Sequence, residues 1–219
     1  MKVFITGIGR GIGYGLTKRF IQNGDEVYSI GRSNPFEEGV KFYKLDLRAF
    51  EKIPIALNAL EIDRLDLAIL NAGILGEIKE MKYWAVYELQ EIFDVNVWAN
   101  KVLIDSIHDS CDKIVLMSSG AAVNGNAGWG GYSLSKCALN MMASIYAKEI
   151  DSKIYALAPG VIDTDMVAKV ISADHSTFPS LDRVEKSRID LEEGVDRILK
   201  AIERLEEFPN GSFVDVRLI

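Results

Sequence analysis

Seven short apolar segments recur along the chain, and each ends at small or turn-forming residues. Most of them are continuously apolar rather than alternating, which is typical of strands that are buried on both faces of a parallel sheet. We therefore predict strands at 2–7, 26–31, 40–45, 65–73, 113–120, 153–160 and 212–216.

Amphipathic helical patterns lie between these segments. After the first strand, Ile12, Leu16 and Phe20 share one helical face, and Asp190 with Glu193 resembles the capping box of a last helix. The apolar face of that helix consists of Val195, Ile198, Leu199, Ile202 and Leu205. Strands and helices alternate through the whole chain, which predicts an α/β fold with a doubly wound, parallel seven-stranded sheet and helices on both faces.

The chain shows no internal repeat, low-complexity tract or interdomain linker. Residues 1–219 are therefore expected to form one domain. The least regular stretch lies at about 163–190 and contains the sequence SADHSTFPSLD. We expect a flexible substrate loop or lid there.

Composition and charge narrow the classes of partner. Hydrophobic residues make up 48% of the chain, which supports a sizeable core, and the net charge is −7 from 25 basic and 32 acidic residues. No basic tail or stripe is present, which disfavours nucleic acid and anionic membranes as partners. No apolar run approaches the roughly 20 residues that cross a bilayer. No signal peptide precedes the first strand, so a cytoplasmic protein is expected.

The residues that most often bind metals are scattered. Cys111 and Cys137 lie far apart without metal-like spacing, and His108 and His175 have no paired ligands. We therefore expect no metal site, and buried thiols in a reducing compartment account for the two cysteines.

A glycine-rich turn follows the first predicted strand and opens the first helix. It reads Thr6-Gly7-Ile8-Gly9-Arg10-Gly11-Ile12-Gly13. Glycines let the backbone approach a pyrophosphate, and a helix N-terminus offers free N–H groups and the positive end of its dipole. An ordinary glycine-rich turn is the alternative, but this position is where such a fold places its ligand crevice.

The end of the second predicted strand indicates which dinucleotide is bound. An NAD site usually has an acidic residue there to bind the ribose 2′-hydroxyl, whereas this chain has Gly31 followed by Arg32. Arg10 lies in the glycine turn itself. Two guanidinium groups suit a 2′-phosphate, so the pair favours NADP(H), although each arginine alone could be a solvated surface residue.

Further motifs carry a resemblance to a known family. Tyr132 lies thirteen residues after Ser119, and Lys136 follows it by one helical turn. Together with the other motifs, this arrangement resembles the single-domain short-chain dehydrogenases/reductases from Thr6 to Val216, and the resemblance implies a Rossmann fold. The matching motifs are Thr6-Gly7-x-x-x-Gly11-Ile12-Gly13, Asp46-Leu47, Asn71-Ala72-Gly73, Asn96, Ser119, Tyr132-x-x-x-Lys136 and Pro159-Gly160-x-x-x-Thr164.

The resemblance implies a role for each of four catalytic residues. Tyr132 would be the general acid in reduction, Lys136 would lower its pKa and bind the nicotinamide ribose, Ser119 would bind the substrate carbonyl, and Asn96 would hold a water. The chemistry agrees, because a free phenol has a pKa of about 10 and a nearby ammonium favours the phenolate. Ser118 is the rival of Ser119, and the family spacing selects Ser119.

The resemblance also implies contacts to the cofactor. Asp46 and Leu47 would contact the adenine, Ile162 and Thr164 would hold the carboxamide, and the Asn71-Ala72-Gly73 segment would support the cofactor side of the sheet. Pro159 and Gly160 belong to the same cofactor-binding set. The family often has a second Asn where this chain has Leu70, so a simple strand-ending turn remains an alternative for residues 71–73.

These observations predict an NADPH-dependent carbonyl reductase or alcohol dehydrogenase. A non-catalytic NADPH sensor or scaffold on the same fold is the alternative, and an extended epimerase would need an added substrate domain for which the chain leaves no room. The substrate would be a small aldehyde, ketone or alcohol, and candidate pocket walls are Val123, Asn124, Trp129 and Met166.

The two longest predicted helices suggest self-association. The helical stretches at 84–108 and 131–150 carry more apolar side chains than one face of a sheet needs. In the family, the two matching helices form the subunit interface. We therefore expect a homodimer or homotetramer, unless all these side chains face the sheet; they are Trp84, Tyr87, Trp98, Met141, Met142 and Tyr146.

Overall fold

The computed structural model describes all 219 residues and contains one sheet of seven parallel strands. The strand order is β3-β2-β1-β4-β5-β6-β7. This arrangement confirms the predicted doubly wound parallel sheet. The strands are β1 (Lys2–Ile5), β2 (Glu26–Gly31), β3 (Val40–Lys44), β4 (Leu65–Leu70), β5 (Cys111–Met117), β6 (Lys153–Ala158) and β7 (Phe213–Asp215).

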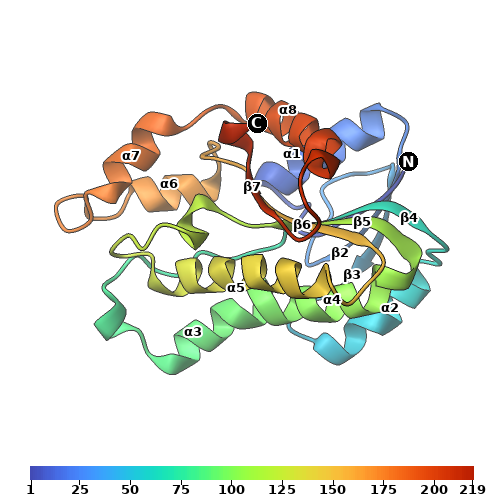
Figure 1. Cartoon of the computed structure of the whole chain (residues 1–219), viewed down its shortest axis with the longest axis horizontal. Coiled ribbons are helices and arrows are strands. Elements are labelled where there is room, and N and C mark those ends of the chain that lie inside the picture. The colour runs from blue at the N-terminus through green and yellow to red at the C-terminus, as the bar shows by residue number, and fades with distance from the viewer.

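Helices cover both faces of the sheet, which Figure 1 shows nearly edge-on. One face is covered by α1 (Gly11–Gln22) and α8 (Leu191–Arg204). The other is covered by α2 (Ile53–Ala59), α4 (Ala99–Ile107) and α5 (Gly130–Tyr146). Short 3₁₀ turns occupy Phe50–Lys52, Met81–Tyr83, His108–Ser110, Gly120–Ala122, Leu205–Glu207 and Val216–Leu218. None of the helices is long and apolar enough to cross a lipid bilayer.

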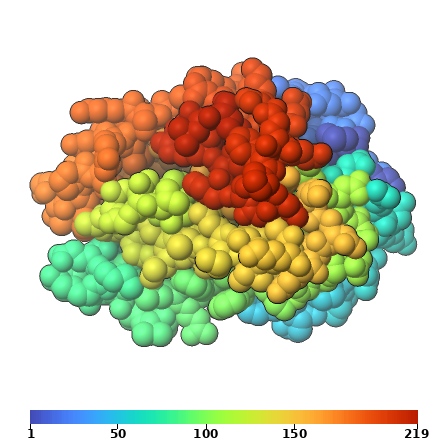
Figure 2. Space-filling model, in the orientation of Figure 1, coloured from blue at the N-terminus to red at the C-terminus, as the bar shows by residue number.

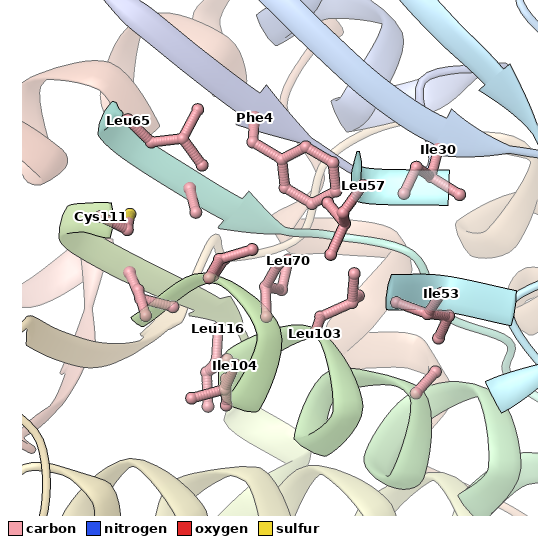
Figure 3. Close-up of a cluster of buried hydrophobic side chains, with 14 of the residues drawn as sticks. Phe4, Ile30, Ile53, Leu57, Leu65, Leu70, Leu103, Ile104, Cys111 and Leu116 are labelled. Carbon is pink, nitrogen blue, oxygen red and sulfur yellow. The ribbon is translucent and has the colours of Figure 1, made fainter. Parts of the chain in front are cut away.

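The side chains of each central strand pack into two cores, one on each face of the sheet, because successive side chains of a strand point to opposite sides. In β1, Phe4 packs under α4 and α5, whereas Val3 and Ile5 pack under α1 and α8. The two cores contain 23 and 20 buried residues, so the sheet is buried on both faces as its apolar strands predict. Figure 3 shows part of the first core, with Phe4 from β1 near Leu57 from α2 and Leu70 from β4 near Leu103 from α4.

The long helical stretch predicted at 84–108 consists of three consecutive helical segments. They are α3 (Val86–Phe93), a π-helical turn η3 (Asp94–Trp98) and α4. The π turn contains Asn96, whose side chain is fully buried. Such turns inside α-helices are frequent at functional sites, because they change the direction of a side chain without ending the helix.

The segment predicted as a flexible loop at 163–190 contains two helices, α6 (Asp165–Ile171) and α7 (Ser180–Ser187). The sequence did not indicate these helices because each is only about two turns long, which hides its periodicity. Leu181 and Val170 are buried with Leu75 and Phe178 in a small third core. The two helices project at one end of the molecule, as the orange segment in Figure 2 shows.

The helix α8 begins as the sequence predicts, but with half of the predicted cap. Asp190 Oδ1 accepts a hydrogen bond from the backbone N–H of Glu193 at 2.8 Å. The Glu193 carboxylate does not return to the backbone of Asp190, because it pairs with Arg197 at 2.5 Å. Asp190 is therefore an N-cap without a reciprocal capping box.

Candidate active site

Two adjoining cavities lie at the carboxyl ends of the strands, where open α/β sheets bind their ligands. The larger one has a volume of about 590 Å³ and is lined by the glycine turn and the ends of β2 and β4. The smaller one has a volume of about 250 Å³ and is lined by the end of β5, the start of α5, and α6 and α7. Ile12, Thr164 and Met166 line both cavities, so the two form one continuous cleft.

The glycine turn has the geometry of a close approach between backbone and ligand. Gly7 and Gly11 have φ values of 75° and 56°, in the left-handed region that favours glycine. A Cβ atom on Gly13 would lie 2.2 Å from the Gly7 carbonyl oxygen, so only glycine fits there. Arg10, at the N-cap position of α1, makes no side-chain cap, which leaves the first N–H groups of the helix available to an anion.

Thr6 and Asn71 hold the two loops of the larger cavity together. The buried Thr6 hydroxyl accepts hydrogen bonds from the backbone N–H groups of Asn71 and Ala72, both at 3.1 Å. Asn71 Nδ2 in turn donates to the carbonyl oxygens of Thr6 and Gly7, at 3.0 and 3.3 Å. These bonds use both side chains to join β1 to β4, so the Asn71-Ala72-Gly73 segment is a bridge between strand ends rather than a simple turn.

The structure brings most of the predicted cofactor residues to the cleft. Those that line its larger part are Gly7, Arg10, Gly11, Ile12, Arg32, Asp46, Leu47, Asn71, Ala72, Gly73 and Thr164. Pro159, Gly160, Ile162 and Tyr132 line its smaller part. Thr6, Gly13 and Lys136 line neither cavity and lie behind the residues that do.

Arginines gather at the end of the larger cavity formed by β2 and β3. Arg10 pairs with Asp165 at 3.2 Å, but both side chains are mostly exposed, so this pair is weak. Arg48 forms a two-pronged pair with Asp46, and its hydrogen bonds lower the pKa of Asp46 to about 2. Arg32 forms no ion pair, although its charge also helps to lower the pKa of Asp46.

Ser119 and Tyr132 meet at the smaller cavity, with Lys136 behind them. Ser119 lies just past the end of β5, and Tyr132 lies in the first turn of α5. Both side chains line the cavity, while Lys136 is buried behind Tyr132 with its Nζ atom 5.5 Å from the centre of the phenol ring. Lys136 Nζ donates to the Met117 carbonyl oxygen at 2.7 Å, which fixes the ammonium against β5.

Burial shifts the pKa values of both groups of the Tyr132–Lys136 pair. It raises the pKa of the Tyr132 phenol, and the Ser119 hydroxyl acts in the opposite direction. It lowers the pKa of Lys136 to about 8. The phenol therefore keeps its proton at neutral pH, whereas the sequence predicted a phenol with a lowered pKa.

Asn96 anchors the loop after β4 instead of facing the cleft. Its Oδ1 atom accepts from the Ile74 N–H at 2.8 Å, and its Nδ2 atom donates to the Ile74 carbonyl and to Ser135 Oγ, both at 2.9 Å. Ser135 lies on α5 between Tyr132 and Lys136 in sequence. The Asn96 amide therefore ties the cofactor side of the cleft to the helix that carries Tyr132.

The structure favours Ser119 over its neighbour Ser118 as the substrate contact. The Ser118 hydroxyl donates to Asn140 Oδ1 at 2.6 Å, and its side chain is 2% exposed. The Ser119 oxygen accepts the backbone N–H of Ala121 at 3.1 Å, and its hydroxyl group lies on the cavity beside that of Tyr132.

Three of the four predicted pocket walls line the smaller cavity, namely Asn124, Trp129 and Met166. The prediction for Val123 was wrong, because its side chain is 63% exposed and does not line the cavity. Sequence reasoning missed Arg48 in the larger cavity, and Arg183 and Arg217 in the smaller one. No group of three or more His, Cys, Asp or Glu side chains is placed to hold a metal ion.

Comparison with known proteins agrees with this geometry. A family model described as short chain dehydrogenase matches residues 1–175. The chain belongs to the short-chain dehydrogenase/reductase family. Its relatives include a benzil reductase ((S)-benzoin forming) of Bacillus cereus, 27% identical with 98% of both chains covered. A benzil reductase of Saccharomyces cerevisiae is 31% identical over 75% of this chain and 72% of the relative.

Solved structures of short-chain dehydrogenases/reductases share the fold. The KRED1-Pglu enzyme superimposes with a TM-score of 0.86 at 24% identity, covering 98% of this chain and 100% of that one. A short chain dehydrogenase of Shigella flexneri complexed with NADP gives a TM-score of 0.81 at 20% identity, covering 99% and 96%. At these identities the likeness concerns the fold.

Proposed function

We propose that this protein is an NADP(H)-dependent carbonyl reductase in which Tyr132 is the general acid. The observation that supports this most is the joint placement of Tyr132 and Ser119 on one small cavity that adjoins the cleft at the glycine turn. A carbonyl oxygen in this cavity can accept hydrogen bonds from both hydroxyl groups. A bound nicotinamide supplies the hydride to the carbonyl carbon.

The residues behind the cavity suit this role. The raised pKa of Tyr132 keeps its proton in place at neutral pH, where the proton can be donated to the carbonyl oxygen as charge develops there. Lys136 is still mostly an ammonium at pH 7, because its pKa of about 8 lies above that pH. Its charge, close to the phenol ring, stabilises the phenolate that the proton transfer leaves behind.

The preference for NADP(H) over NAD(H) rests on the end of β2. Gly31 offers no carboxylate to a ribose 2′-hydroxyl, and Arg32 beside it has no carboxylate partner. Arg10 is held only by an exposed pair with Asp165 and can turn to a 2′-phosphate. A double change of Arg10 and Arg32 to Gln is expected to weaken NADPH binding about tenfold or more and to leave NADH binding nearly unchanged.

The smaller cavity suggests the size of the substrate. Its volume of about 250 Å³ is at the low end for ligand sites, and its walls mix Trp129, Met166 and Val170 with a few polar groups. Because relatives of this chain are benzil reductases, vicinal diketones are the first compounds to test.

The test follows NADPH absorbance at 340 nm with purified protein and a panel of aldehydes, ketones and diketones. We expect consumption of NADPH with at least one carbonyl compound, and loss of that activity in Tyr132→Phe. Tight NADPH binding without turnover of any compound would favour the non-catalytic sensor. Equal binding of NADPH and NADH by the native protein would contradict the assignment of Arg32 to a 2′-phosphate.

We also propose that the protein forms a homo-oligomer through exposed apolar side chains of the η3 turn and of α5. Trp98, Leu134, Met141 and Ile145 are each about half exposed or more, at 48%, 47%, 62% and 47%. A cluster of exposed apolar side chains on neighbouring helices is typical of an interface. A sedimentation mass of 24.3 kDa, the mass of one chain, at micromolar concentration would contradict this proposal.

A further inference from the structure

The smaller cavity contains arginine and no acid. Its lining includes Arg183 and Arg217 but no Asp or Glu, in a chain whose net charge is −7. A cavity that excludes carboxylates in so acidic a protein indicates that its occupant is not a cation. This assignment rests on the carbonyl reductase proposed above, in which the occupant of the smaller cavity is the carbonyl substrate.

Arg183 differs from nearly all other arginines in this chain. Every arginine except Arg32 and Arg183 forms an ion pair with a carboxylate. The partner of Arg183 is a neutral amide, because its Nη2 atom donates to Asn126 Oδ1 at 3.2 Å. The two guanidinium groups without an ion pair thus line the two parts of one cleft, Arg32 the larger cavity and Arg183 the smaller one.

Arg183 lies on the face of α7 that is turned to the cavity. Ser180, Arg183, Val184 and Ser187 all line the cavity, at the spacing of one side of a helix. Ser180 Oγ also accepts a hydrogen bond from Trp129 Nε1 at 3.2 Å, which ties this face of α7 to the residue three positions before Tyr132. Arg183 therefore lies on the wall of the cavity that α7 forms beside Trp129.

The charge of Arg217 is already offset. Its Nε and Nη2 atoms donate to the two oxygens of Asp215 at 2.8 and 2.5 Å. Although burial alone would raise the pKa of Asp215, the hydrogen bonds from Arg217 lower it, so the carboxylate stays charged. The net positive charge of the cavity is consequently that of Arg183, with Arg217 as a further N–H donor.

We propose that the substrate is an oxo acid, whose carboxylate binds Arg183 while its carbonyl group meets Tyr132 and Ser119. A guanidinium presents a planar pair of N–H donors that matches the two oxygens of a carboxylate. A cofactor phosphate is a poorer assignment, because Arg183 does not line the larger cavity, where Arg10, Arg32 and Arg48 gather around the glycine turn. The alternative is that Arg183, which is exposed, is simply solvated.

The test compares two probes that differ in charge and share one carbonyl group: benzoylformate and its methyl ester. Binding of each is measured by calorimetry to Tyr132→Phe saturated with NADPH, so that turnover does not interfere. We expect the acid to bind about tenfold tighter than the ester or more, as a charge-assisted hydrogen bond predicts. Adding Arg183→Gln should abolish this preference and leave the affinity for the ester and for NADPH unchanged.

Arg188→Gln is the matched control. Arg188 lies directly after α7 and pairs with Asp163 at 3.6 Å, but it does not line the cavity. The preference for the acid should persist in this variant. Equal binding of the two probes, no binding of the acid, or a preference that survives Arg183→Gln would each overturn the proposal. A loss of NADPH affinity in Arg183→Gln would assign the residue to the cofactor and would overturn it as well.

Failure of this inference is separable from failure of the proposed function. If the native protein reduces neutral ketones with NADPH and binds benzoylformate no better than its ester, only the oxo acid assignment fails. If the native protein reduces no carbonyl compound at all, the proposed function as a carbonyl reductase fails, whatever the binding of the two probes shows.

Discussion

Replacing Asn96 with alanine should destabilise the protein strongly, although the residue lines neither cavity. The side chain is fully buried and makes three hydrogen bonds, two with the backbone of Ile74 and one with Ser135. Asn96→Ala leaves the N–H and C=O groups of Ile74 without these partners. A buried group left unsatisfied costs about 1–3 kcal/mol, and because Ile74 is only half-buried we expect a total loss of about 2–4 kcal/mol in the free energy of unfolding.

Thermal and urea unfolding measure this loss. For a chain of 219 residues, a few kcal/mol should lower the melting temperature by roughly 10 °C. Asn58→Ala is the control, because Asn58 is an exposed asparagine in α2 and its loss should change stability by less than about 0.5 kcal/mol. If Asn96→Ala unfolds at the same midpoint as Asn58→Ala, the hydrogen bonds of Asn96 do not support the fold as we argue.

The same substitution should also impair the site. A Cβ on Gly73 would lie 3.3 Å from Asn96 Oδ1 and 3.5 Å from Lys136 Nζ, so this amide, this glycine and this ammonium are packed together. Loss of the amide loosens the loop beside Lys136. We expect kcat/KM to fall in Asn96→Ala even at temperatures where the variant is fully folded.

Three further predictions concern the glycine turn, the buried lysine and the helices over the cavity. Gly13→Ala should abolish NADPH binding, measured by fluorescence, because its Cβ would overlap the Gly7 carbonyl at 2.2 Å. NADPH affinity should fall as pH rises above about 8, where Lys136 loses its proton in the free protein, and titrations of Lys136→Met should lack this step. The His175 ring lies 2.6 Å from Asp182 Oδ1 and 2.8 Å from the Ile171 carbonyl, and these acceptors raise its pKa. The protonated His175 ring therefore stabilises α6 and α7 fully below pH 6.5, and this stabilisation is lost as the pH rises through the raised pKa. Protection of the α6 and α7 amides from hydrogen exchange should accordingly depend more on pH in the native protein than in His175→Gln.

Most of the sheet could be predicted from the sequence because buried parallel strands leave a simple apolar signal. The strand predicted at 26–31 has the same bounds in the structure. The strand predicted at 65–73 ends at Leu70, because Asn71 and Ala72 leave the ladder to bond with Thr6. This difference was hidden from the sequence, since it depends on a partner 65 residues away.

The lining of the larger cavity was also predictable, because its glycines and arginines fall at fixed places relative to strands. Much of the lining of the smaller cavity was not, because its residues come from segments without a common pattern. Val123 is near Ser119 in sequence, yet the turn at Gly120–Ala122 directs it to solvent. Arg183 reaches the cavity only because α6 and α7 fold over it, and a short helix in a polar segment gives no clear periodicity.

The most direct test of the account is the single-turnover reduction of a carbonyl substrate by Tyr132→Phe beside the native protein. The substitution keeps the ring and removes only the proton that we assign to the carbonyl oxygen. General acid catalysis typically contributes about 10²–10⁴-fold, so we expect a rate loss of that size while the Kd for NADPH changes by less than about twofold. A Tyr132→Phe protein that reduces the substrate at a near-native rate would contradict the assignment of Tyr132 as the acid.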